Sequence, residues 1–466
     1  MQIPILNGIY TDTAPDVRTA YPVNLVPVPK ASGVSNGYLR PADGIVSFAT
    51  GEGGDRGGIN WNGQCYRVSG TKLVRVNANG TADVLGDVGP GAPVTFDYSF
   101  DYLAIASAGN LYLWNGTILQ QVTDPDLGVC VDVVWVDGYF MTTDGEFLIV
   151  TELNNPFAID PLKYGSSEVD PDPVKALLKV RNEVHALNRY TIEVFENVGG
   201  DNFPFDRIDG AQIQKGVVGT RAACVFAEAI AFLGSGRNEN VSIYLGANGN
   251  AQPLATREID QVLAQYSEAT LSTVVLESRL DKGHQHLWVR LPDRTLVYDL
   301  AASQAVQEPV WFTLASGLEE IGALPAAFLV RCYDKWLVGD PGSNRIGYLD
   351  DTTSDHYGEP AQWEFSTSIL YNEGDSAIIH ELELVALTGS VAADTDPTIS
   401  TAYSVDGMTW SQERTIRAGI RGQRAKRLVW LQQGWMEHWR VQRFRGDSRA
   451  HLSFLRLEAR VEALAA

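Results

Sequence analysis

The stretch that decides the fold reads YSFDYLAIASAGNLYLWNGTILQQV over residues 98–122. Its side chains alternate in character with a period of two, as in pleated strands, where neighbouring side chains point to opposite faces. The pattern predicts three short antiparallel strands near 101–106, 111–114 and 117–122. Asn115-Gly116 is predicted to close a hairpin as a type I′ turn, which needs a positive φ at both central residues. So small a meander cannot bury both of its faces alone, and it therefore requires neighbours like itself.

Similar units recur along the chain. Strands are expected to begin near Gln64, Asp101 and Gly138, which are 37 residues apart in both intervals, and Asn-Gly or Asp-Gly pairs occur at 62–63, 79–80, 115–116, 137–138 and 144–145. Less regular units follow over 176–198, 222–254, 274–314 and 326–349. Such a repeat is typical of a β-propeller. We expect seven blades, or six if the last unit only closes the ring with the N-terminal segment, and Tyr112 and Trp114 should pack between blades.

Two connections within the repeats have local signals. Residues 154–173 contain several prolines and are expected to form an irregular loop. Residues 257–266 carry apolar side chains at helical spacing, so a helix is expected there with Thr256 as its N-cap.

The chain is expected to be mainly β and to divide into three parts. Residues 1–58 are punctuated by Pro and Gly and are predicted to form an extended N-terminal arm and loop. Residues 59–360 carry the repeats and form the propeller-like domain. Residues 361–466 contain strand-like runs without the 37-residue spacing, and they predict a C-terminal antiparallel β-sandwich.

Charge is distributed unevenly. The chain has 57 acidic and 36 basic residues, a net charge of −21, yet residues 401–466 hold 12 basic residues against 6 acidic ones. The first 400 residues therefore hold 24 against 51, a net charge of −27. Such an acidic surface argues against a grip on nucleic acid or anionic lipid.

The basic residues of the C-terminal part concentrate in one stretch, over residues 414–427. We expect this stretch to be a solvated loop, a docking surface for an acidic partner (the acidic region of another copy of this chain included), or a direct contact with DNA. The interface residues of the docking hypothesis are Arg414, Arg417, Arg421, Arg424, Lys426 and Arg427.

No catalytic residues are expected, because no nucleophile motif such as GxSxG is present. His284 and His286 lie two apart on a predicted strand and would form half of a metal site, but no carboxylate or cysteine cluster has complementary spacing. We therefore expect neither a metal nor another cofactor. The cysteines are far apart and are expected to be reduced, apolar residues of a chain folded in the cytoplasm; they are Cys65, Cys130, Cys224 and Cys332.

Residues 403–410, YSVDGMTW, are close to the S-x-D-x-G-x-T-W "Asp box" of propeller sialidases, with one residue fewer between Asp and Gly. The box resembles a structural hairpin rather than a catalytic site, and a glycosidase would need two carboxylates at a defined separation. A propeller that binds or cleaves glycans is nevertheless the alternative function.

Several longer stretches carry a family likeness. The most specific is TIEVFENVGG (191–200) followed by FPFDRIDGAQIQKGVVGT (203–220); the others are YPVNLVPVPK (21–30), GYLRPADGI (37–45), TREIDQVLAQYS (256–267), LWVRLPDRTLVYDL (287–300), SVDGMTW (404–410) and WRVQRFRG (439–446). In these stretches the chain resembles the packaged-DNA stabilisation proteins, or tail hub (nozzle) proteins, of short-tailed bacteriophages. Residues 51–90 and 155–180 match that pattern poorly.

The resemblance implies a structural virion protein and not an enzyme. It implies a homo-oligomeric ring, expected to be a hexamer, docked below the portal and its adaptor ring. The ring would close the DNA exit after packaging, carry tail needle, fibre or spike proteins, and conduct DNA on ejection. It would lie in the virion tail after synthesis in the host cytoplasm, without membrane insertion by this chain. An acidic conduit would let double-stranded DNA pass without specific binding, because each Lys or Arg contact to phosphate adds affinity. A glycan-binding or glycan-cleaving β-propeller of a phage tail remains the alternative.

Overall fold

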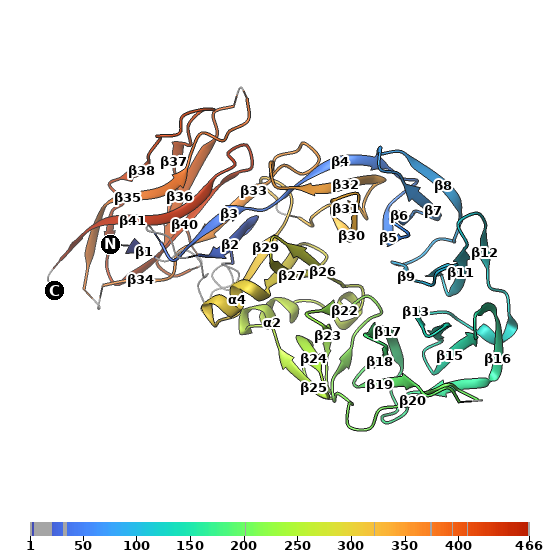
Figure 1. Cartoon of the computed structure of the whole chain (residues 1–466). Coiled ribbons are helices and arrows are strands. Elements are labelled where there is room, and N and C mark those ends of the chain that lie inside the picture. The colour runs from blue at the N-terminus through green and yellow to red at the C-terminus, as the bar shows by residue number, and fades with distance from the viewer. Residues whose placement is uncertain are drawn as a thin grey trace.

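A computed structural model describes residues 2–3, 21–30, 35–200, 202–320, 322–372, 375–393, 395–407 and 409–464. Figure 1 shows a ring of small sheets and, beside it, a stack of longer strands that holds both marked chain ends. Within the described residues the ring contains seven antiparallel sheets between Gly44 and Asp350, and the stack contains two more. The architecture is the predicted one, a propeller followed by an antiparallel sandwich.

The sheets of the propeller follow one another along the chain. The first contains β5 (Asp55–Trp61), β6 (Gln64–Ser69), β7 (Lys72–Val76) and β8 (Ala82–Asp87); the second β9 (Thr95–Tyr98), β10 (Leu103–Ser107), β11 (Asn110–Trp114) and β12 (Leu119–Gln121); the third β13 (Asp132–Val136), β14 (Tyr139–Thr143), β15 (Phe147–Glu152) and β16 (Asn155–Ser166). The fourth contains β17 (Val174–Val180), β18 (Glu183–Asn188), β19 (Ile192–Asn197) and β20 (Phe205–Arg207); the fifth β21 (Gly216–Val217), β22 (Ala223–Phe226), β23 (Ala229–Ser235), β24 (Ser242–Ala247) and β25 (Asn250–Pro253). The sixth contains β26 (Val275–Asp281), β27 (His284–Arg290), β28 (Thr295–Asp299) and β29 (Trp311–Leu314); the seventh β30 (Ala327–Cys332), β31 (Lys335–Gly339), β32 (Arg345–Asp350) and β4 (Gly44–Thr50).

The helices of the described residues are short. They are η1 (Pro125–Leu127), α2 (Arg257–Leu263), α3 (Glu268–Leu271) and α4 (Leu300–Val306). The predicted helix over 257–266 is thus shorter than expected, and Thr256 occupies its N-cap position as predicted. The Thr256 side chain makes no capping hydrogen bond, because its hydroxyl lies 2.7 Å from the Tyr21 hydroxyl.

The N-terminal segment closes the ring. Strand β4 pairs antiparallel with β32, so that Gly44 lies opposite Asp350, and Figure 1 shows this blue strand along the edge of the orange sheet. The next strand, β5, begins the first sheet and contacts β30 of the seventh. The predicted arm over 1–58 is therefore wrong for its last part, because β4 and the start of β5 belong to the propeller.

The sandwich also takes strands from the N-terminal part. One of its sheets contains β1 (Gln2–Ile3), β2 (Leu25–Pro29), β3 (Gly37–Pro41), β35 (Ala377–Leu387), β38 (Leu428–Leu431), β39 (Trp435–Met436) and β41 (Ser453–Ala463); the other contains β33 (Gln362–Ser366), β34 (Leu370–Tyr371), β36 (Thr398–Ser404), β37 (Arg414–Arg417) and β40 (Trp439–Asp447). Buried aromatic rings fill the space between the sheets: Trp363 lies 4.7 Å from Phe454, and Phe365 lies 5.3 Å from Phe444, between ring centroids. Aromatic area of this kind dominates the burial energy of a core.

The hairpin turns agree with the prediction at two positions and differ from it at a third. Asn62-Gly63 and Asp137-Gly138 have positive φ at both residues, as a type I′ turn requires. At Asn115-Gly116 only the glycine has a positive φ. The Asn115 side chain instead accepts hydrogen bonds from the N–H groups of Thr117 and Ile118, at 2.9 and 2.8 Å, so the turn is held by a side chain. The proline-rich stretch expected to be a loop contains β16, which pairs with β15 through two register shifts.

Neighbouring sheets of the propeller are joined in two ways. Apolar side chains pack between them, and Trp114 is buried with Trp61 and Tyr66 of the first sheet while Tyr112 packs against the same cluster, which confirms that prediction. Buried or half-buried carboxylates on the first strand of one sheet also accept hydrogen bonds from backbone N–H groups on the first strand of the next. These pairs are Asp97 with Trp135 (2.6 Å), Asp132 with Leu177 (2.8 Å) and Glu277 with Phe328 (2.9 Å).

Candidate interaction surface at the junction of propeller and sandwich

The predicted basic stretch begins on β37 and continues into a loop over residues 418–427, called the basic loop here. Three of its six cations are engaged within the sandwich. Arg417 Nη1 lies 2.9 Å from Asp396, and Arg427 Nε donates to Glu383 at 2.7 Å. Arg414 Nη1 donates to the Leu431 carbonyl at 3.0 Å. Three of the six residues predicted to form the interface therefore already bind partners within the sandwich.

Arg427 and Glu383 form an exposed pair. The hydrogen bonds from Arg427 hold the pKa of the Glu383 carboxyl below its usual range, and the same bonds raise the pKa of the guanidinium. Solvent screens such a pair, so it contributes little to stability, but it fixes the direction of the Arg427 side chain. Lys426 is exposed and has no ion pair within the described residues.

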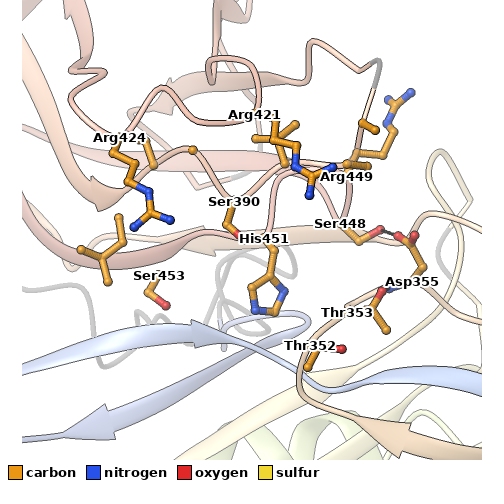
Figure 2. Close-up of a pocket in the computed structure, with 16 residues that line it drawn as sticks. Thr352, Thr353, Asp355, Ser390, Arg421, Arg424, Ser448, Arg449, His451 and Ser453 are labelled. Atoms are coloured by element: carbon orange, nitrogen blue, oxygen red, sulfur yellow. Dashed lines mark hydrogen bonds between the residues drawn. The ribbon is translucent and has the colours of Figure 1, made fainter.

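Arg421 and Arg424 behave differently from the other arginines. Both are exposed, neither makes an ion pair within the described part of the chain, and both line a groove of about 790 Å³. The groove, called the junction groove here, is bounded by residues 352–355 just after the propeller and by the sandwich segments 387–393 and 448–453. Figure 2 shows Arg421 and Arg424 extending from the sandwich toward His451 and the segment that carries Thr352 and Thr353.

Two further charged side chains line the junction groove, Arg449 and Asp355, and each has a hydrogen-bond partner. Arg449 donates to Asp447 through Nε at 2.9 Å and Nη2 at 2.6 Å, and these bonds raise the pKa of Arg449. The Asp355 carboxylate accepts a hydrogen bond from the Ser448 hydroxyl. Burial lowers the pKa of His451, so its imidazole is neutral at pH 7. Arg421 and Arg424 are therefore the cations of the groove that have no ionic partner within the described residues.

A glycine allows the basic loop to reach the groove. Gly389 has a φ of +88°, and a Cβ at this position would lie 3.1 Å from the backbone N and the Cγ of Arg424. The Gly422 N–H donates to the Gly389 carbonyl at 3.0 Å, and the Thr388 hydroxyl donates to the Gln423 carbonyl at 2.9 Å. The loop over 387–393 thus holds the basic loop through short backbone contacts that leave the Arg424 side chain directed into the groove.

The Asp-box-like residues form a structural turn between β36 and β37. The Thr409 N–H and hydroxyl donate to the two carboxylate oxygens of Asp406, at 2.7 and 2.6 Å, and the Ser404 hydroxyl accepts from the Gly407 N–H at 2.7 Å. Both oxygens of the carboxylate are engaged within its own turn, so the geometry gives the glycan hypothesis no support. Met408 lies outside the described residues.

The buried thiols agree with an apolar role for the cysteines. All four are free, and Cys65, Cys130 and Cys332 are buried. Burial raises the pKa of both Cys65 and Cys130 to about 12, so neither thiol is a nucleophile at neutral pH.

The sequence reasoning missed one cluster. His284 and His286 do share a face of β27, as predicted, and the carboxylate partner that the spacing did not reveal is Asp299 on the neighbouring strand β28. The register places His286 directly opposite Asp299. The sequence signal that could have revealed this pair is the short connection between β27 and β28. A short connection sets the register of a hairpin and therefore determines which residues lie opposite each other.

Helices that could cross a membrane were sought among the described residues, and none is both long enough and sufficiently apolar.

Comparison with known proteins gives matches across the chain. The family model described as "Bacteriophage P22 Gp10, beta-propeller" matches residues 1–354, and the one described as "Bacteriophage P22 Gp10, beta-sandwich" matches residues 362–462. The tail hub protein gp10 of Salmonella phage P22 is 27% identical over 455 residues, which is 93% of this chain and 93% of that protein.

Two solved structures show a weaker likeness. The Pan2 WD40 domain of Neurospora crassa is 10% identical, with a TM-score of 0.44 over 66% of this chain and 96% of that one. The N-terminal domain of Nup159 is 8% identical, with a TM-score of 0.39 over 71% of this chain and 100% of that one.

The two family matches divide where the structure passes from the propeller to the sandwich, between β32 and β33. They confirm the predicted family, the predicted fold class and the prediction of a structural protein that is not an enzyme. The chain therefore belongs to the bacteriophage P22 Gp10 family, as a structural component of a phage tail.

Proposed function

We propose that this chain is the repeating subunit of the tail hub ring of a short-tailed bacteriophage. The ring, a homohexamer, sits below the portal and its adaptor ring in the virion tail and is assembled in the host cytoplasm. It closes the DNA exit after packaging, carries the needle, fibre or spike proteins, and conducts DNA on ejection. The observation that carries the proposal is the match of both domains to a tail hub protein over 93% of each chain.

The charge distribution supports the DNA conduit. The first 400 residues, which contain the propeller, have a net charge of −27. A channel lined by many Lys and Arg side chains would bind the phosphates and slow the passage of DNA, because each contact adds affinity through counterion release. An acidic subunit avoids this cost and repels the duplex.

We further propose that the junction groove is a contact between subunits. Its two uncompensated guanidiniums fit a carboxylate-bearing segment, since the planar guanidinium binds carboxylates through two parallel hydrogen bonds. The most abundant source of such segments in a homo-oligomer is the acidic propeller of the neighbouring copy. Arg421 and Arg424 therefore carry the interface, whereas Arg414, Arg417 and Arg427 are engaged within the sandwich.

The test is ring formation by the purified full chain, alone and with its adaptor ring. Light scattering gives the mass of the particle, and negative-stain images show whether it is a six-fold ring. A chain that stays monomeric with the adaptor ring present, and that is absent from purified tails, would contradict the hub assignment.

The groove is tested with the charge-reversed double variant Arg421→Glu/Arg424→Glu. We expect it to fold with the wild-type circular dichroism spectrum and to form few rings, with an affinity loss of about tenfold or more for two lost charge pairs. The matched control is Arg181→Glu/Arg331→Glu, which makes the same change in net charge at exposed positions of the propeller. If the groove variant assembles as well as this control, the adaptor or another surface holds the ring together.

A further inference from the structure

A second group of side chains, unrelated to the basic loop, lies on the sixth sheet of the propeller. His284 Nδ1 lies 2.6 Å from Asp299 Oδ2, and His286 Nε2 lies 3.3 Å from the same oxygen. The facing atoms of the three side chains all lie within 4.8 Å of one another. Two imidazole nitrogens and one carboxylate oxygen thus converge on one point.

The Asp299 carboxylate has the two imidazoles as its only nearby basic groups within the described residues. The side chain of Asp299 is fully buried, and within the described residues no Lys or Arg nitrogen lies within 4.0 Å of it. Arg40 and Arg279 line a cavity with His286, but they are shared between Asp43 and Asp281: Arg40 lies 3.0 Å from Asp43 and 2.5 Å from Asp281. A buried carboxylate is costly unless it is paired, and the partner of Asp299 is therefore either an imidazolium of one of these histidines or a cation held by all three side chains.

The Asp299 carboxylate is held in a fixed orientation by the start of α4. Its Oδ1 accepts the Ala302 N–H at 3.0 Å and caps α4, which leaves Oδ2 for the two imidazoles. His286 is held by the Phe312 ring, whose centroid lies 5.5 Å away. Both His286 and Asp299 are therefore fixed by the fold, whereas the side chain of His284 is 27% exposed and can adjust.

The geometry suits a small divalent ion with a preference for nitrogen ligands. Zinc binds imidazole and carboxylate at about 2.0–2.2 Å, which puts neighbouring ligand atoms of a tetrahedron about 3.3–3.5 Å apart. The separation of His286 Nε2 and Asp299 Oδ2 already has this value. His284 would move by several tenths of an ångström, and its exposed side leaves room for a water molecule as the fourth ligand. Magnesium and calcium prefer oxygen ligands, so the imidazole pair selects against them.

We propose that His284, His286 and Asp299 form a binding site for one divalent transition-metal ion of the zinc type. The ion would replace the proton shared between Asp299 and the imidazoles, and it would join β27, β28 and the start of α4. Helix α4 packs against both β27 and the sandwich strand β2, so the site lies at a seam between the two domains. The proposal does not depend on the hub assignment, because one chain supplies all three ligands.

The test is metal binding by the full chain after treatment with a chelator. Cobalt(II) is the probe, because a four-coordinate cobalt site has strong visible absorption, and equilibrium dialysis with zinc gives the stoichiometry. We expect one ion per chain and competition of zinc for the cobalt site. Absence of the visible bands, or zinc bound only in many weak sites, would overturn the proposal.

Two variants identify the ligands. Asp299→Asn keeps an oxygen that can cap α4 and removes the charge, and His284→Ala changes a partly exposed side chain that the core does not need. We expect each to weaken zinc binding by about tenfold or more, because even groups behind the ligands account for about 10- to 100-fold. The matched control is His380→Ala, which removes a histidine that lies 2.8 Å from a single carboxylate, Glu462, on the sandwich. If His284→Ala and His380→Ala bind zinc alike, the site is not the one proposed.

Discussion

The side-chain amide of Asn24 donates a hydrogen bond to the carbonyl oxygen of Gln362 at 2.6 Å, although the two residues are 338 positions apart in sequence. The same amide donates to the Ala315 carbonyl at 2.8 Å, and the Asn24 Oδ1 accepts the Ala315 N–H at 3.0 Å. Ala315 follows the last strand of the sixth sheet, and Gln362 begins the sandwich. One buried asparagine therefore joins the N-terminal segment, the propeller and the sandwich.

Replacing Asn24 should loosen this junction. Asn24→Ala leaves buried backbone groups without partners, which costs about 1–3 kcal/mol, and adds strain because Asn24 has a φ of +54°. Asn24→Gly loses the same hydrogen bonds but adds no strain, because glycine readily adopts a positive φ. We expect both variants to lower the urea midpoint of the sandwich transition, and alanine to lower it more. Midpoints equal to that of the wild type would show that the junction does not depend on this side chain.

The carboxylate that links the third and fourth sheets should make stability depend on pH. Burial raises the pKa of Asp132 to about 6, above the value of 3.8 for an unfolded aspartate. Between these two values the folded chain binds the proton more tightly than the unfolded chain does. The contribution of Asp132 to stability is therefore greatest below about pH 4 and is lost as the pH rises through about 6.

Asp132→Asn removes this titration and keeps an oxygen that can accept the Leu177 N–H. Relative to the wild type, the free energy of unfolding of this variant should rise between about pH 4 and pH 7 by an amount on the order of 2 kcal/mol. Urea denaturation at the two pH values measures it, and Asp101→Asn, at an exposed aspartate of the second sheet, is the control. A difference that does not change with pH would mean that Asp132 does not titrate in this window.

Replacing Gly389, which contacts the basic loop, with alanine should destabilise the protein. Gly389→Ala introduces strain at a φ of +88° and brings a Cβ to 3.1 Å from Arg424. Gly434→Ala is the matched control, since Gly434 has a φ of +82° and nothing within 4 Å of its Cβ position. We expect the control to cost about 1 kcal/mol through strain alone. Gly389→Ala should cost more and also reduce ring assembly, because Arg424 must shift. If the two substitutions reduce stability and ring assembly equally, the position of the basic loop does not matter for the interface.

Local pattern was sufficient to predict the sheets of the propeller, because alternation and turn residues act over a few positions. It was not sufficient at Asn115, where a side-chain turn replaces the expected backbone geometry, or at Thr256, whose hydroxyl meets Tyr21 from a distant part of the chain. The same limit applies to residues 1–58. Their prolines indicated irregular structure, but β3 pairs with β41 and β4 pairs with β32, which lie far away in the sequence.

The candidate sites also contain some features that local pattern could predict and others that it could not. Composition located the basic stretch, yet it could not separate Arg427, which Glu383 holds, from Arg421 and Arg424, which remain unpaired. Asp299 was missed because its proximity to His286 comes from strand register rather than from spacing in the sequence. Contacts between residues that are close in sequence can be predicted from pattern, and contacts made by register or by chain closure require the structure.

The pairing of β4 with β32 has a consequence for how the protein is made. The ribosome releases β4 early, but β32 follows only after the other propeller sheets, and β41, which pairs with β3, comes last of all. The propeller can close only after β32 has emerged and the sandwich only after β41 has, so folding must await pairings between distant segments, which are slow to form. During that interval β32 and β41 have open edges that could accept the same segment from another nascent chain. A short-lived exchange of N-terminal strands between copies is therefore the kinetic hazard of this fold, and a chaperone that held the first fifty or so residues would remove it.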